Sequence, residues 1–165
     1  MKKTLHFRHG LAAMTATIVM LFAQLLATNA RTSGISPATA GDETSSYGIN
    51  IIGVPVTSEN CNDLSVIDGV SGTVKYDPTT KTLTLENATI DAGNKDQAIS
   101  NNGISNLNIQ VTGTNNIKSS SAAIIILKPT TIKGDGTLNT ASTTDCGIFT
   151  TSSPLTIEDC TVNAT

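Results

Sequence analysis

The sequence has few of the residues from which most enzyme active sites are built. Among its 165 residues there is no tryptophan, aromatic residues make up 3%, and both histidines, His6 and His9, lie in the first ten positions. Beyond that segment the chain cannot form a Ser-His-Asp triad, a His-ligated zinc site or a histidine general base. The aromatic residues that follow, Tyr47, Tyr76 and Phe149, are too few for a strip of rings on which sugars stack, and we interpret each as a packing residue.

Positive charge is also scarce. After position 30 the chain carries seven basic residues against 13 acidic ones, a formal charge of −6, and its only arginine there is Arg31. Such a chain is repelled by phosphate backbones and by anionic lipid. We therefore expect no nucleic-acid partner.

The segment 1–30 has the pattern of a secretory signal peptide. Lys2, Lys3 and Arg8 precede an uncharged, mostly apolar run over positions 11–27, and Ala30 offers a small residue at the cleavage position. The run is shorter than the stretch of about 20 residues that a transmembrane helix needs. We expect cleavage after Ala30, export to the medium or the cell surface, and no membrane span afterwards. The segment 31–48, rich in Ser, Thr, Gly and Ala, is predicted to be a flexible leader, and the segment 49–165 the folded domain.

Three cysteines remain, and they match no zinc or redox spacing. An odd number leaves at least one thiol unpaired, even in an oxidising compartment. If a disulfide forms, Cys146 and Cys160 are the favoured pair by separation, but we interpret Cys61, Cys146 and Cys160 as small buried hydrophobic residues.

Short apolar segments recur at a nearly constant interval. Four of them end in apolar residues 24, 23 and 25 positions apart: Leu85, Ile109, Ile132 and Ile157. Isoleucines that follow a small residue repeat at intervals of 25 and 24: Ile99, Ile124 and Ile148. Three segments fall within each interval, joined by Asn, Gly, Ser and Asp, which favour turns. The pattern predicts an all-β fold, a single-stranded parallel β-helix with three strands per coil and about three coils over positions 83–165.

A polar series repeats at the same interval. Its members stand at regularly spaced positions in four successive intervals: Asp91, Asn115, Asn139 and Asn163. Asparagine tolerates the backbone of tight corners, and stacked amides bond to one another from coil to coil. We expect this series to form a ladder with a structural role.

The segment before the repeat predicts an antiparallel cap. The segment 72–86 has the pattern of a hairpin, in which two alternating stretches flank a turn at Asp77-Pro78-Thr79-Thr80. A β-helix leaves unpaired backbone groups at its first coil, and antiparallel strands over positions 49–82 would cover them.

The hairpin and the later turns resemble a known family. The segment 72–90, together with 109–115 and 155–162, is similar to β-helix domains of secreted bacterial proteins that are described as carbohydrate-binding. The resemblance covers positions 49–165 and implies a right-handed β-helix that binds acidic or cellulosic polysaccharide, with calcium assisting in some members. It rests on strand and corner residues, so it assigns no ligand-binding residue in this chain.

Acidic residues of the repeat are the candidates for chemistry. Asp135, Asp145 and Asp159 are candidate calcium ligands because calcium prefers oxygen donors, although no EF-hand or nonapeptide motif surrounds them. Asp135 and Asp159 are also separated by one interval of the repeat, so they could lie one above the other as paired glycosidase carboxylates do. Asp135, however, lies in Gly134-Asp135-Gly136, a turn sequence that explains it without catalysis. We expect no enzyme activity.

Two functions remain open from sequence. The first is a noncatalytic polysaccharide-binding module, supported by the abundance of Thr, Ser and Asn after position 30, whose side chains can hydrogen-bond a glycan. The alternative is a structural or adhesin-like stalk of a longer surface protein.

The chain stops in the middle of a coil, which predicts further coils or domains in a parent protein. We expect the segment 155–165 to be the least ordered part of the repeat and the isolated chain to associate end to end, because exposed strand edges template pairing. Light scattering measures this, and a stable monomer at high concentration would contradict it.

Overall fold

The computed structural model describes residues 44–95 and 97–165. The predicted signal peptide, positions 1–30, and most of the predicted leader lie outside the described residues. Strand β1 begins at Ser46, so the last three residues assigned to the leader belong to the folded domain. No helix in the described part of the chain has the length and apolarity required to span a membrane.

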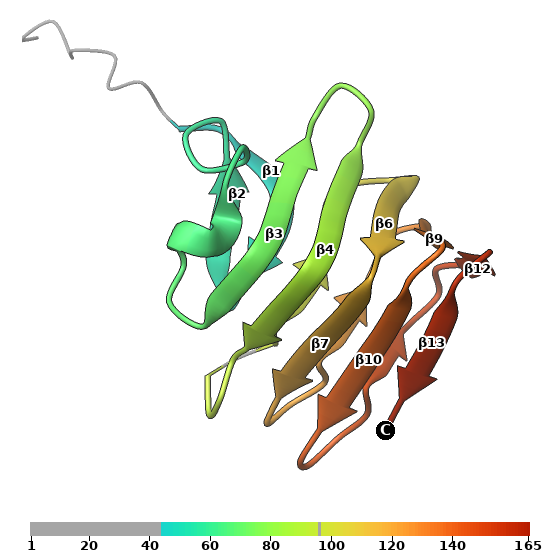
Figure 1. Ribbon diagram of the computed structural model, residues 1–165. Helices are drawn as coiled ribbons and strands as arrows, with labels where there is room; N and C mark the ends of the chain where they lie inside the picture. The colour runs from blue at the N-terminus through green and yellow to red at the C-terminus, as the bar shows by residue number, and fades with distance from the viewer. Residues whose placement is uncertain (1–43, 96) are drawn as a thin grey trace, which may run out of the picture. The chain divides into compact units, whose positions relative to one another are not determined.

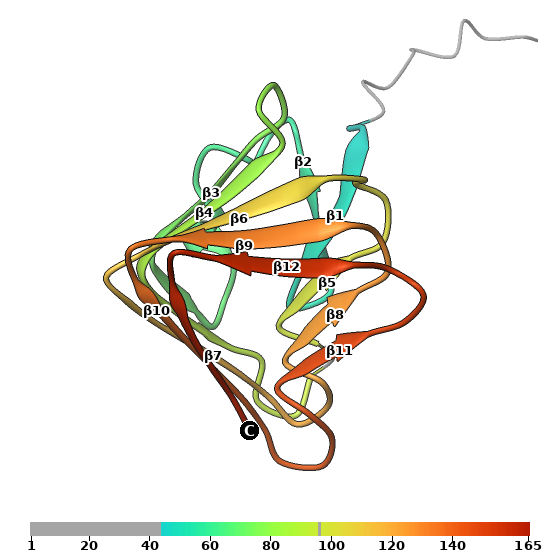
Figure 2. The same ribbon diagram turned by 90° about the vertical axis from the view of Figure 1, so that its right-hand side faces the viewer.

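The repeat forms a three-sided β-solenoid of about three coils (Figures 1 and 2), which confirms the predicted all-β parallel fold. The first face consists of the beginning of β4 (Thr82–Asp91) with β6 (Leu107–Thr112), β9 (Thr130–Gly134) and β12 (Leu155–Glu158). The second face consists of the end of β4 with β7 (Thr114–Ser119), β10 (Thr137–Ser142) and β13 (Thr161–Ala164). The third face consists of β5 (Ile99–Asn101), β8 (Ile124–Ile126) and β11 (Ile148–Thr150). Within each face the strands pair in parallel with the coils before and after.

Antiparallel strands cover the first coil, as predicted. Strand β1 (Ser46–Ile51) pairs with β5 and with β2 (Val54–Thr57), and β3 (Val70–Asp77) runs along the whole of β4. A 3-10 helix, η1 (Leu64–Val66), connects β2 to β3. At the corner between the first two faces β3 passes Asn87 at Gly72, which has φ +80° and where a Cβ would lie 2.3 Å from the Asn87 carbonyl oxygen. Only glycine fits this crossing.

The register of the first coil differs from the prediction. Leu83, not Leu85, pairs with Ile109, and the series continues through Ile132 to Ile157. Leu85 pairs with Val111 instead. The prediction was wrong because the first coil is two positions longer than the predicted interval. Alternate residues of a strand point to the same side, so Leu83 and Leu85 both point inward and the apolar pattern does not distinguish them. The predicted series Ile99, Ile124 and Ile148 is confirmed.

The predicted amide ladder is confirmed at Asn139 and Asn163 and is wrong at its first two members. Asn116, not Asn115, pairs with Asn139, which pairs with Asn163, and Asp91 pairs with Lys118. The Nδ2 group of Asn139 donates to Asn116 Oδ1 at 3.1 Å, and Asn163 Nδ2 donates to Asn139 Oδ1 at 2.8 Å. These amides lie on the outer side of the second face. Asn115 points inward, is fully buried, and accepts a hydrogen bond from the Ala88 N–H at 2.8 Å.

Apolar side chains fill the interior from the cap to the second coil. Leu83, Ile109, Ile124 and Ile132 are at most 1% exposed. In the last coil Leu155 and Val162 are half-buried, and Ile157 is 48% exposed. The apolar side chains of that coil are therefore partly open, while end-to-end association stays a prediction.

Two buried threonines differ in their hydrogen bonding and provide a test of the core. Thr140 Oγ1 has no partner within the described residues, whereas Thr130 Oγ1 donates to the Lys128 carbonyl at 2.9 Å and accepts from Asn101 Nδ2 at 3.0 Å. We expect Thr140→Val to raise the free energy of unfolding by about 1 kcal/mol because it removes an unsatisfied hydroxyl. Thr130→Val should lower it by about 1–2 kcal/mol because it breaks two hydrogen bonds. Urea unfolding of both variants measures the difference, and equal effects would contradict the assignment.

Candidate functional site

The three candidate calcium ligands lie at two different corners. Asp135 is in the turn between β9 and β10, and Asp159 is in the turn between β12 and β13, so both lie where the first face meets the second. Asp145 lies between β10 and β11, where the second face meets the third. The described residues contain no group of three or more acidic, histidine or cysteine side chains able to hold a metal ion. The three residues do not form one calcium site, and calcium binding stays a prediction.

The cysteines carry no visible chemistry. All three are free: Cys61 is buried, and Cys146 and Cys160 are half-buried. Desolvation raises the pKa of both half-buried thiols, and for Cys146 the neighbouring Asp145 raises it further. Because the thiolate is the reactive form, these thiols are poor nucleophiles at neutral pH.

Two of the three aromatic residues pack as predicted. Tyr47 and Tyr76 contact each other in the cap with ring centroids 5.3 Å apart, and Tyr76 is 4% exposed. The prediction for Phe149 was wrong. It points outward from the third face and is 42% exposed, because Ile148, its neighbour in sequence, takes the inward position.

The outer side of the first face carries polar side chains in two rows that run across the strands. The threonine row pairs one residue from each strand: Asp77, Thr82, Asn108, Thr131 and Thr156. The lysine row lies two positions away on the same strands: Lys75, Thr84, Gln110, Lys133 and Glu158. Successive members of a row are about 4.8 Å apart, the spacing between neighbouring strands.

Most of these side chains keep their hydrogen-bonding groups free. Within the described residues, eight of the ten make no side-chain hydrogen bond and no ion pair: Lys75, Thr84, Asn108, Gln110, Thr131, Lys133, Thr156 and Glu158. They range from half-buried to exposed. On the second face the amide row is bonded to itself, through the bonds of Asn139 with Asn116 and Asn163, while the side chains of Lys118 and Thr161 are unbonded within the described residues. The first face therefore offers a regular array of donors and acceptors to a ligand.

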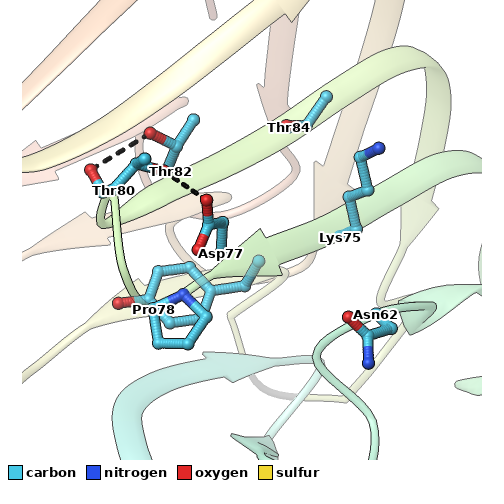
Figure 3. Close-up of a pocket in the computed structure, with 8 residues that line it drawn as sticks. Asn62, Lys75, Asp77, Pro78, Thr80, Thr82 and Thr84 are labelled. Carbon is cyan, nitrogen blue, oxygen red and sulfur yellow. Dashed lines mark hydrogen bonds between the residues drawn. The ribbon is translucent and has the colours of Figure 1, made fainter.

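Both rows lead into a cavity at the cap (Figure 3). It has a volume of about 460 Å³ and is lined by Asn62, Lys75, Tyr76, Asp77, Pro78, Thr80, Thr82 and Thr84. Four of these residues are the first two members of each row. Asn62 comes from the loop between β2 and η1, and Pro78 and Thr80 come from the turn between β3 and β4. This volume is within the range of small-molecule sites.

Hydrogen bonds fix the acidic side of the cavity. Asp77 Oδ2 accepts from the Thr80 hydroxyl and Oδ1 accepts from the Thr79 N–H, both at 2.8 Å. The hydrogen bond from the Thr80 hydroxyl, and to a smaller extent that from the Thr79 N–H, lowers the pKa of Asp77 below its ordinary value of 3.8. On the other side, the Lys75 ammonium has no ion-pair partner within the described chain. The cavity thus holds a fixed carboxylate and an unpaired cation two positions apart on β3.

The sequence indicated only part of this site. The alternation of the predicted hairpin places Lys75, Asp77, Thr82 and Thr84 on one side of its two strands, although none was assigned a role. The sequence did not indicate Asn62, because its place in the cavity depends on how the loop between β2 and η1 folds.

Comparisons with known proteins find no match: no family model, no curated protein and no solved structure is similar to this chain at a significant level. The assignment of a function therefore rests on the residues and the geometry described above.

The Thr80–Asp77 hydrogen bond gives a test of the cavity wall. Because the folded-state pKa of Asp77 lies below its unfolded value, the ionised carboxylate stabilises the fold above the unfolded pKa, and this stabilisation is lost as the pH falls through the folded pKa. We expect Thr80→Ala to raise the pKa of Asp77 toward 3.8 and to reduce the loss of thermal stability on acidification. An NMR titration of the carboxyl carbon, with Thr82→Ala as the control, measures the shift. An unchanged pKa in Thr80→Ala would contradict it.

Proposed function

We propose that this chain is a noncatalytic polysaccharide-binding module of an exported protein, and that the polymer lies across the strands of the first face. The observation that carries the proposal is that two adjacent rows of the first face keep free donors and acceptors, whereas on the second face the amide row is bonded to itself. Export is supported by the signal-peptide pattern of positions 1–30.

The spacing of the rows supports a polymer rather than a single small molecule. A strand repeat of about 4.8 Å is close to the length of one sugar ring, so successive rings of an extended chain can meet successive strands. Each ring offers several hydroxyl groups, which both donate and accept. Binding through hydrogen bonds also agrees with the absence of aromatic rings from the rows of this face.

The carboxylates within the two rows support the noncatalytic part of the proposal for this face. Asp77 and Glu158 are at opposite ends of the rows, four strand steps or about 19 Å apart. Glycosidases place their two carboxyl groups about 5–9.5 Å apart. A hydrolytic pair therefore cannot be formed by these two residues of the first face.

The alternative, a structural stalk, has one observation in its favour. The amide ladder of the second face continues from coil to coil and would rigidify a longer solenoid in the same way. A stalk needs no free array on the first face, so a binding experiment separates the two functions.

The test is a glycan array probed with the purified chain, with and without calcium. For each glycan that binds, affinity is measured for Asn108→Ala/Thr131→Ala on the first face and for the matched control Lys118→Ala/Thr161→Ala on the second. We expect the first variant to bind about tenfold more weakly because two hydrogen bonds are lost, and the control to bind as the parent does. Absence of binding on the array by a chain with an intact circular-dichroism spectrum would reject the module and favour the stalk. Release of new reducing ends from a bound glycan would reject the noncatalytic part of the proposal.

A further inference from the structure

At the cap, the two rows of the first face end at a loop. Strand β3 is the last strand on that side, and the loop before η1 lies against its free edge (Figure 1). The Tyr76 N–H donates to the Cys61 carbonyl at 2.7 Å, which attaches the loop to the edge of β3. Asn62 follows directly and lines the cavity at the end of both rows. A polymer lying along the rows therefore meets this loop.

The loop is a preformed wall rather than a segment that yields. Cys61 is 5% exposed and anchors it in the core, and the Cys61 N–H donates to the Thr57 carbonyl at 2.9 Å. The Asn60 side chain closes the same turn, accepting from the Thr57 N–H at 2.8 Å and donating to the Pro55 carbonyl at 3.0 Å. Because these bonds join the loop to the end of β2, displacing it would break several hydrogen bonds at once.

The cavity in front of the wall has the groups that bind a sugar ring. Lys75 and Asn62 donate, the carboxylate of Asp77 accepts, and the Thr84 hydroxyl can do both. Asn62, Lys75 and Thr84 make no side-chain hydrogen bond within the described residues, so they are available to a ligand. The turn residues Pro78 and Thr80 close a second side.

We propose that this cavity is an end-stop: it holds the terminal sugar ring of a polysaccharide chain whose following rings lie along the threonine and lysine rows. The inference rests on the proposed function and deepens it, because it assigns the ligand as a chain end and not as the interior of a polymer. An internal segment would have to rise over the Asn62 loop, losing contact with Lys75 and Asp77. A chain end fills the cavity and keeps every row contact.

The decisive quantity is the number of protein molecules bound per glycan chain. The probes are polygalacturonate and cellulose-derived chains, each as a short and a long fraction of known mean length, titrated by calorimetry. End recognition predicts a stoichiometry of about one module per chain that does not change with length. A stoichiometry that grows in proportion to length would overturn the end-stop while leaving polysaccharide binding intact. No binding to either polymer would overturn both.

A blocking variant assigns the end to this cavity. Asn62→Trp places a large side chain in the cavity, and Asn94→Trp places the same side chain at another exposed loop asparagine, far from the first face in the fold. We expect Asn62→Trp to weaken binding of the short fractions about tenfold or more and Asn94→Trp to leave it unchanged. Lys75→Ala should act in the same direction as Asn62→Trp, since Lys75 is exposed and its loss does not disturb the core. Equal affinities for all three variants and the parent would contradict the proposal.

Discussion

The fold depends on one constraint: each strand must find its backbone hydrogen-bond partners on the strand one coil earlier, about 4.8 Å away. Parallel pairing places each residue beside its counterpart in the next coil, so the same position is repeated along the solenoid. Inward positions become columns such as Leu83, Ile109 and Ile132, which exclude water together. Outward positions become rows at the same spacing. A regular array on the surface is thus a by-product of the backbone pairing that builds the core.

The two faces differ in which polar side chains strand pairing places beside one another. On the second face three asparagines are in register, and an amide both donates and accepts, so the ladder satisfies itself. On the first face a threonine stands beside an asparagine and a glutamine beside a lysine, and these neighbours do not bond to each other. The same stacking therefore yields one row of bonded amides on the second face and two rows of mostly unbonded side chains on the first.

The repeat, the cap and the hairpin could be predicted from the sequence because apolar alternation and turn residues are local signals. The register of the first coil could not, since Leu83 and Leu85 both point inward and either satisfies the pattern. The ladder prediction was wrong at Asn115 for a similar reason: Asn115 and Asn116 are adjacent, and only the pairing of β7 with β10 decides which of them points outward. The cavity could not be predicted from local sequence patterns, because the long-range hydrogen bond between Tyr76 and Cys61 places Asn62 there.

The cap explains why the solenoid has a site at this end. If β3 were the strand of another parallel coil, the rows would continue past it, with the next strand on its free edge. Strand β3 is instead antiparallel to β4 and joined to it by the short turn at Pro78, so that turn stands beside the rows. The free edge of β3 must still be covered, because an exposed edge templates aggregation, and the loop at Cys61 covers it. The two elements that protect the first coil from further pairing are therefore the two walls of the cavity. The cap that covers the first coil therefore also forms the site.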